Sequence, residues 1–302
     1  MYIKQTIQET YDLITKNKTN LILYALLQIA FLFALFVITV GSLIIGGIIG
    51  GINTAHVLSS ENPTILDVIS SITTIGLPLI LWIAFYIITL IIFFIFMSLI
   101  FTRLIYLTSK GTVMPITMAS VSTLINYAKT NFIQYFKLLF TIIILVFFVN
   151  LVLLILFVVL VLSLSFFGSF IKEIIPILSI IFVLILSFVF VLLWIILDIF
   201  SAAAITMFFM GNENIGSIKL LRAGWRLFIS NLIEFVLFML VALIVVLFVL
   251  IVKLILSIIP YCGMILGYII SYTLMFAIGV AWFVFIAHLV EKQQKTATST
   301  II

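Results

Sequence analysis

The sequence predicts an all-α, polytopic integral membrane protein with six transmembrane helices, and three observations carry that prediction. Of the 302 residues, 66% are hydrophobic and only 8% are charged, and the mean hydropathy is +1.54. A soluble globular domain is about 45–50% apolar and about 25% charged, so this composition excludes one. Six apolar runs are long enough, or nearly so, to cross a hydrocarbon core of about 30 Å. The runs lack the alternating polarity of barrel strands, so helices must satisfy their backbone groups.

The six runs occupy most of the chain and leave little room for a domain outside the membrane. They are Leu21–Ile52, Leu77–Thr102, Leu138–Phe167, Ile175–Leu197, Phe235–Val252 and Met264–Ala287. The third run is uncharged over about 30 residues, which would make a helix of roughly 45 Å, so we expect it to tilt or protrude. We expect a single membrane domain over residues 1–302, in which residues 293–302 form a short cytoplasmic tail.

The distribution of basic residues predicts the orientation. Twelve of the 14 lysines and arginines fall in the N-terminal segment, the second and fourth connections and the C-terminal tail, which six spans place on one side of the membrane. Lys172 and Lys253 fall on the other side. The positive-inside rule therefore predicts a cell-membrane protein with both termini in the cytoplasm.

A short motif recurs at the start of each odd-numbered span. The three copies lie in Lys18–Tyr24, Lys129–Tyr135 and Ile229–Phe235, and they share Ser/Thr, Asn, Leu/Phe, Ile, any residue and an aromatic residue. We expect three parallel repeats, over about 1–108, 109–210 and 211–292, each an interfacial amphipathic helix followed by a transmembrane hairpin. The alternative is that the motif recurs by chance in so biased a composition.

Helical periodicity upstream of each motif supports the amphipathic helices. Apolar residues three or four positions apart share a helix face. On this basis we expect an apolar face of Ile218, Leu221, Trp225 and Phe228 opposite the basic residues Lys219, Arg222 and Arg226. The corresponding apolar positions of the other two repeats are Ile7, Tyr11 and Ile14, and Met118, Val121 and Ile125.

The motif suggests two roles. Its Ser/Thr or Asn side chain could cap the first turn of the span by accepting free N–H groups. The helix dipole and the neighbouring basic residues would also favour anionic lipid headgroups. Capping and anchoring at the interface alone is the alternative to specific lipid binding. The candidate headgroup contacts are Lys18, Asn20, Lys129, Asn131, Lys219, Arg222, Arg226 and Asn231.

Three polar residues within the apolar runs form a candidate intramembrane site. Asp198 is a functional candidate because a carboxylate inside a membrane is costly, although an interfacial or helix-pairing role is the alternative. We expect Gln28 and Asn150 to hydrogen-bond between helices. These two occupy different positions in their repeats, which argues against a symmetric pore.

Other polar and small residues have simpler interpretations. Gly46 and Gly50 form a G-x-x-x-G pattern, overlapped by Gly47 and Gly51, that permits close helix packing. Glu234 and Lys253 would reach opposite membrane interfaces, and His288 would lie near the cytoplasmic end of the last span.

The sequence offers no catalytic, cofactor-binding or metal-binding set. His56, Glu61 and Asp67 share the first outer loop, but their spacing matches no metal-ligand pattern. Phosphate-loop, zinc-protease and nucleophile-elbow motifs are absent from the sequence. The pI of about 9.3 comes from interfacial Lys and Arg and does not indicate nucleic-acid binding. We expect a protein that is not an enzyme.

The stretch Phe209–Gly211 and the following Trp225–Asn231 carry a family resemblance. With the repeated unit, they resemble the six-helix membrane domain that precedes the catalytic domain in some glycerophosphoryl diester phosphodiesterases, and its stand-alone uncharacterised prokaryotic relatives. The resemblance implies a fold and a membrane location. Because only fifteen residues follow Ala287, we do not expect the phosphodiesterase activity.

These observations lead to one functional hypothesis and its rivals. The first is a non-catalytic membrane protein that organises lipid or anchors a protein partner at the cytoplasmic face. The alternative is a transporter or lipid-translocating protein with Asp198 and Asn150 near its path. A membrane-embedded enzyme is the third, since no acid–base pair or nucleophile converges in the sequence.

Overall fold

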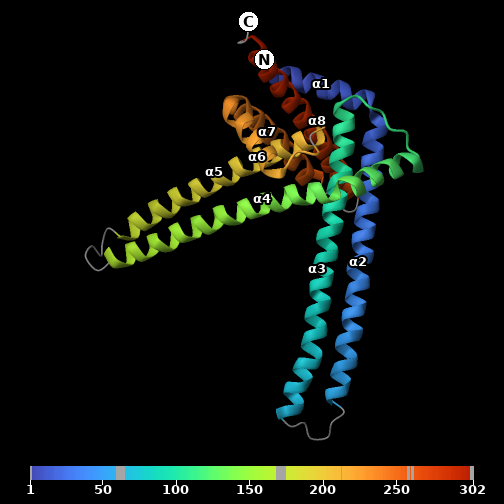
Figure 1. The fold of residues 1–302 in the computed structure, drawn as a ribbon, viewed down its shortest axis with the longest axis vertical. Helices are drawn as coiled ribbons and strands as arrows, with labels where there is room; N and C mark the ends of the chain where they lie inside the picture. The colour runs from blue at the N-terminus through green and yellow to red at the C-terminus, as the bar shows by residue number, and fades with distance from the viewer. Residues whose placement is uncertain are drawn as a thin grey trace. The chain divides into compact units, whose positions relative to one another are not determined.

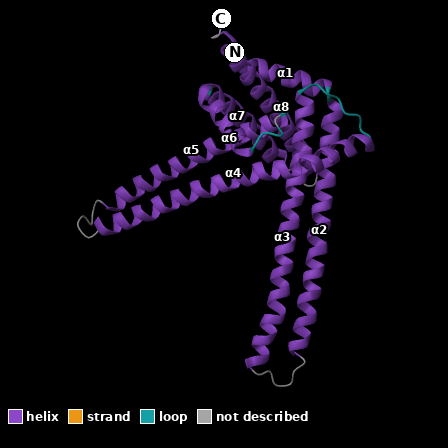
Figure 2. Cartoon of the chain, viewed as in Figure 1, coloured by secondary structure: helices purple, strands orange, loops and turns teal. Residues whose placement is uncertain are grey.

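The computed structural model describes residues 2–58, 65–167, 175–211, 213–256, 259 and 262–299. The fold is all-helical, with 93% of residues in helices and no strand among the described residues (Figure 1, Figure 2). The helices are α1 (Tyr2–Lys16), α2 (Lys18–Leu58), α3 (Ile65–Ser109), α4 (Met118–Phe167), α5 (Ile175–Phe209), α6 (Ser217–Ser230), α7 (Leu232–Leu256) and α8 (Cys262–Ser299).

Six of these helices, namely α2, α3, α4, α5, α7 and α8, are long and apolar enough to cross a membrane. The all-α class and the six predicted spans are therefore confirmed, and the chain is a multi-pass membrane protein. Each helix extends beyond its apolar run. The 50 residues of α4, for example, correspond to roughly 75 Å, well beyond the thickness of a hydrocarbon core.

Large apolar side chains cover the outer surfaces of the spans. Phe33, Phe85 and Phe148 are among the many that are mostly exposed. A water-soluble surface does not carry apolar patches of this extent, whereas lipid tails accommodate them. The contacts between the spans therefore involve only a minority of their apolar side chains.

Contacts divide the chain into two compact units. The larger unit contains Met1–Lys16, Ile105–Thr112 and Thr130–Ile302, and the smaller unit contains Asn17–Leu104 and Val113–Lys129.

In the smaller unit, α2 and α3 form an antiparallel hairpin (Figure 1). Phe31 stacks on Phe93 with ring centroids 5.3 Å apart, and the Tyr86 hydroxyl donates to Thr39 Oγ1 over 3.2 Å. Gly46 lies directly beside the indole of Trp82, so that an added Cβ would come within 2.9 Å of that ring. The close approach predicted for the glycine pattern is therefore confirmed at Gly46.

In the larger unit, the core lies where the C-terminal part of α5, α6, the start of α7 and the C-terminal half of α8 meet. Aromatic rings dominate this core, and Phe238 stacks on Phe285 with centroids 4.6 Å apart. The buried members are Leu197, Ile199, Phe200, Ala203, Leu227, Phe228, Phe235, Phe238, Phe285, Ile286 and Leu289.

A glycine sets the packing of α6 on α5. A Cβ at Gly224 would lie 2.7 Å from the carbonyl oxygen of Phe200, so the two backbones touch at this point. The buried face of α6 is consequently centred on Gly224, and it comprises Leu220, Gly224, Leu227 and Phe228. Of the predicted apolar face, Phe228 is buried, whereas Ile218 and Trp225 are 68% and 44% exposed. Periodicity identified the apolar residues, but the backbone contact selected which of them are buried.

The three motif positions differ in local structure. A break separates α1 from α2 at Asn17 and α6 from α7 at Asn231. In the middle of the chain, α4 runs without interruption through Asn131. The expectation of a separate amphipathic helix before the span is therefore wrong for this copy, since the backbone stays helical at Asn131 but leaves the helix at Asn231.

Candidate functional site

The structure separates the eight candidate headgroup contacts into two groups. The basic residues Lys18, Lys129, Lys219, Arg222 and Arg226 are all exposed. Asn131 is half-buried, and Asn20 and Asn231 are buried. The prediction of lipid contact therefore rests on the basic side chains.

Asn20 holds together two segments of the smaller unit. Its Oδ1 accepts a hydrogen bond of 2.8 Å from the backbone N–H of Met114, which lies 94 residues later. In the same unit, the Arg103 guanidinium lies 4.2 Å from the ring centroid of Tyr127. The predicted helix cap is wrong for Asn20, because α2 already begins at Lys18 and the amide is used by a distant loop.

Asn231 also serves contacts within the protein. Its Nδ2 donates to the carbonyl oxygen of Leu227 over 3.0 Å, and its backbone N–H bonds to Phe228 O, so the residue terminates α6. Lys292 of α8 donates to Asn231 Oδ1 over 3.4 Å and forms a 2.7 Å ion pair with Glu234. Asn231 also directly precedes α7, where its backbone carbonyl oxygen accepts from the Phe235 N–H, and its side chain links the α6–α7 junction to α8.

The exposed surface of α6 combines two stripes. Ile218, Trp225 and Ile229 share one face at helical spacing and are exposed. A stripe of Lys219, Arg222 and Arg226 lies next to them, and no ion pair among the described residues engages these three. Apolar and basic side chains therefore lie together on the exposed surface of α6, and within it the partly exposed Trp225 ring also packs edge-on against Phe200 of α5, with centroids 5.6 Å apart.

The intramembrane polar residues do not converge. Asn150 of α4 donates to the carbonyl oxygen of Val146 over 2.9 Å and accepts 3.3 Å from the indole N–H of Trp194 on α5. The predicted interhelical bond is therefore confirmed for Asn150, beside a cavity of about 520 Å³ between α4 and α5. Gln28 is half-buried on α2.

Asp198 is exposed on α5, with buried neighbours Leu197 and Ile199 on either side. The helix continues for 11 residues beyond it to Phe209, which corresponds to about 16 Å. Asp198 therefore lies within the candidate span Val183–Phe209, and its side chain is exposed on the surface of α5.

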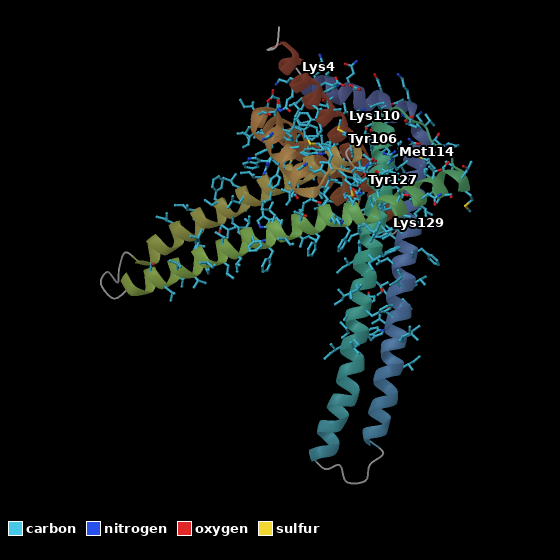
Figure 3. The ribbon with its side chains drawn as sticks, in the orientation of Figure 1. Lys4, Tyr106, Lys110, Met114, Tyr127 and Lys129 are labelled. Atoms are coloured by element: carbon cyan, nitrogen blue, oxygen red, sulfur yellow. The ribbon has the colours of Figure 1, made fainter. Side chains whose placement is uncertain are left out.

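A polar pocket of about 370 Å³ brings together residues that no sequence pattern had linked. His288 of α8 pairs with Glu9 of α1 through a 3.0 Å contact between Nε2 and Oε2, and its Nδ1 lies 3.4 Å from the Thr6 hydroxyl. Tyr106 and Lys110 contribute from the end of α3 (Figure 3). The pocket can hold a polar group, and the contact between Glu9 and His288 links α1 to α8.

The sequence predicts only that His288 lies near the cytoplasmic end of the last span. Its partner Glu9 lies 279 residues earlier, and such a pairing requires the tertiary fold. The sequence indicated only that Thr6 and Glu9, three residues apart, share one face of α1 and could contact the same partner.

A metal site has no support among the side chains that the structure describes. Within them, no group of three His, Cys, Asp or Glu residues converges. His56, Glu61 and Asp67 lie outside the described side chains.

Comparisons of the chain with protein-family models, with curated proteins and with solved structures find no match.

Proposed function

We propose that this chain is a non-catalytic integral membrane protein that binds and organises anionic phospholipid at the cytoplasmic face. One observation carries the proposal: α6 buries one side against α5 and exposes basic residues beside an apolar stripe. An apolar stripe can enter the headgroup boundary while neighbouring Lys and Arg side chains extend to lipid phosphates.

Electrostatics give the expected size of the effect. Each Lys or Arg near an anionic surface contributes about 1 kcal/mol, so Lys219, Arg222 and Arg226 together contribute about 3 kcal/mol, roughly a hundredfold in affinity. Salt screening weakens this attraction, because the Debye length falls as ionic strength rises.

We also propose the three-repeat organisation, which the motif aromatics support. In each copy this ring is buried and packs against an aromatic ring of the returning span. The pairs are Tyr24 with Phe101, Tyr135 with Phe208, and Phe235 with Phe285, at centroid distances of 5.3, 5.6 and 5.3 Å. The first two returning spans are also followed by glycines of positive φ, Gly111 and Gly211.

We also propose the predicted orientation, with both termini in the cytoplasm, and the likeness to the six-helix membrane domain. Cysteine labelling tests the orientation in a Cys262→Ser background. Thr112→Cys should react with a membrane-impermeant maleimide only after the cells are permeabilised. Ser60→Cys, in the predicted outer loop, should react in intact cells. The reverse pattern would place both termini outside.

The experiment on lipid binding compares charge variants of the full chain in nanodiscs. Protein carrying Lys219→Gln, Arg222→Gln and Arg226→Gln is reconstituted in mixed phosphatidylglycerol and phosphatidylcholine, and mass spectrometry counts the lipids that remain bound. The native chain should enrich phosphatidylglycerol, and the triple variant should lose most of that enrichment. Raising the salt concentration should reduce the enrichment of the native chain.

Lys253→Gln provides the control for a loss of charge. Lys253 lies on α7, where its ammonium is 5.4 Å from the ring centroid of Tyr268, and we predict that it is on the opposite side of the membrane. This variant should retain the enrichment. Equal enrichment in the native chain and the triple variant would refute the proposal. A stoichiometric copurifying protein would favour the partner-anchoring form of it.

Asp198 favours a transporter as the second candidate function. An exposed carboxylate inside a candidate span is costly in lipid and is a functional candidate for that reason. If it carries protons or couples flux, Asp198→Asn should abolish solute or lipid flux in reconstituted vesicles. Normal flux in that variant would reject the role.

A further inference from the structure

The polar pocket between α1, the end of α3 and α8 is lined by charged groups of both signs. Its volume of about 370 Å³ lies within the range of about 300–1,000 Å³ that is typical of small-molecule sites. Its charged side chains include Glu9 of α1, Lys110 directly after α3, and Glu291 of α8. All of the lining residues belong to the larger unit. Three separate segments of that unit therefore present charge to a molecule in the pocket.

Two of these charges are not neutralised by the protein. Lys110 and Glu291 are exposed, and neither makes an ion pair with any residue that the structure describes. Figure 3 shows Lys110 beside Tyr106 at the end of α3. Opposite charges that line one pocket without pairing with each other are both available to a ligand that carries both signs.

The third charged group, the carboxylate of Glu9, is held in position by His288. His288 Nε2 lies 3.0 Å from Glu9 Oε2, and its Nδ1 lies 3.4 Å from the hydroxyl of Thr6, which is fully buried. The His288 side chain itself is only 16% exposed. An ionised carboxylate has about four acceptor sites, so Glu9 can accept further hydrogen bonds from an occupant. A carboxylate fixed in this way costs less entropy to bind than a free one.

The ends of two helices add negative partial charge to the same pocket. Tyr106 belongs to the last turn of α3, Met210 directly follows α5, and both line the pocket. The C-terminal end of a helix carries about half a negative charge, which favours a cation nearby. Together with Glu9 and Glu291, these ends favour a cationic group, and Lys110 provides the position for an anionic group.

We propose that this pocket binds a zwitterion that carries a primary ammonium and a phosphate. The ammonium donates hydrogen bonds to the carboxylates of Glu9 and Glu291, and the phosphate pairs with Lys110 Nζ. A primary ammonium has three N–H donors for these carboxylates, whereas a quaternary ammonium has none. Lysine binds phosphate as a point charge. The apolar side chains of Leu13 and Val284, which also line the pocket, accommodate the short carbon chain between the two charges.

Two sources supply this chemistry: the headgroup of phosphatidylethanolamine and soluble phosphoethanolamine. The site goes beyond the proposed function, because the basic residues Lys219, Arg222 and Arg226 of α6 do not line this pocket. The triple variant of α6 should therefore bind the zwitterion as the native chain does. The failure of one proposal leaves the other standing.

The test uses the full chain in nanodiscs of phosphatidylcholine. In one arm, phosphatidylethanolamine is added as a minor lipid, and native mass spectrometry counts the molecules that remain bound. In the other arm, soluble phosphoethanolamine is titrated by calorimetry. Retention of one phosphatidylethanolamine per protein would assign a membrane headgroup to the site, and one-to-one binding of phosphoethanolamine alone would assign a soluble ligand. Binding in neither arm would overturn the proposal.

Two variants test the two halves of the zwitterion separately. Lys110→Gln and Glu291→Gln should each weaken binding about tenfold. Because both side chains are exposed, neither change should lower the unfolding temperature of the ligand-free protein. Phosphocholine, which lacks the N–H donors, should bind the native chain about tenfold more weakly than phosphoethanolamine. Glu291→Gln should reduce this preference, whereas Lys110→Gln should weaken both probes alike.

Lys4→Gln and Asp12→Asn are the matched controls for a loss of charge. Both residues are exposed on α1, and neither is among the residues that line the pocket. These variants should bind the zwitterion as tightly as the native chain. If Lys110→Gln and Glu291→Gln also bind it as tightly, or if the controls lose binding to the same extent, the proposal is overturned. Equal affinity of the native chain for phosphocholine would overturn it as well.

Discussion

The two short helices α1 and α6 have similar sequences in outline but different packing. Both carry apolar residues at helical spacing, and a long apolar helix follows each of them directly. The protein-facing side of α6 buries Leu220, Leu227 and Phe228 around Gly224. The corresponding side of α1 buries two threonines, Thr6 and Thr10, and leaves space beside them.

The difference shows that amphipathic periodicity does not by itself reveal what a helix does. A helix packed backbone to backbone through a glycine, as α6 is, has a structural inner face and only its outer face remains free to bind. By contrast, α1 borders both a polar and an apolar pocket, and the contact between Glu9 and His288 connects it to α8. We therefore expect mutations in the inner face of α6 to affect stability, and those in α1 to affect binding.

The largest contrast is expected between Leu227→Ala on α6 and Ile7→Ala on α1. Leu227 is fully buried, so its truncation should lower the free energy of unfolding by about 2–4 kcal/mol. Ile7 is 51% exposed, and its truncation should cost less than about 1 kcal/mol. Thermal unfolding in detergent measures both. Equal losses would mean that α1 is packed as tightly as α6.

A second test places a methyl group at the contact between α5 and α6. The added Cβ of Gly224→Ala would meet the Phe200 carbonyl, so we expect a loss of about 1–3 kcal/mol even though Ala is the better helix former. Gly47→Ala is the matched control, because Gly47 also lies inside a helix, α2, and a Cβ there meets nothing within 4 Å. If Gly224→Ala were as stable as the native chain, the close approach would not determine the packing of α6.

The smallest effect is expected from the contact between Glu9 of α1 and His288 of α8. Glu9→Gln removes the charge that faces His288, and because Glu9 is largely exposed the global cost should stay below about 1 kcal/mol. Local opening should respond more clearly, so amide exchange within α1 (Tyr2–Lys16) should accelerate while exchange in α6 remains unchanged. Unchanged exchange in α1 would show that the pair does not hold the helix in place.

Much of the fold was predictable from the sequence because hydrocarbon imposes a simple requirement. Each span must be a long apolar helix, and runs such as Leu21–Ile52 and Ile175–Leu197 satisfy it independently of their neighbours. The ends of the helices were less predictable. The segment with Met118, Val121 and Ile125 was predicted to be a separate amphipathic helix, but it is the first part of α4, which continues into the span.

The candidate sites were predictable only in part. The exposed basic residues of α6 followed from counting charges along a helix, which is a local property. By contrast, Asn20 bonds to Met114, Glu9 pairs with His288, and Glu234 pairs with Lys292, all across long sequence separations.

The sequence by itself determined the membrane location, the helical class, the number of spans and the basic character of the segment before α7. These properties depend on composition and on periodicity within single helices. The tertiary structure alone decided which face of α6 is buried, where the motif asparagines bond, and that α1 lies over α7 and α8 above an apolar cavity. Those outcomes depend on shape complementarity between distant segments, which only their packing in three dimensions specifies.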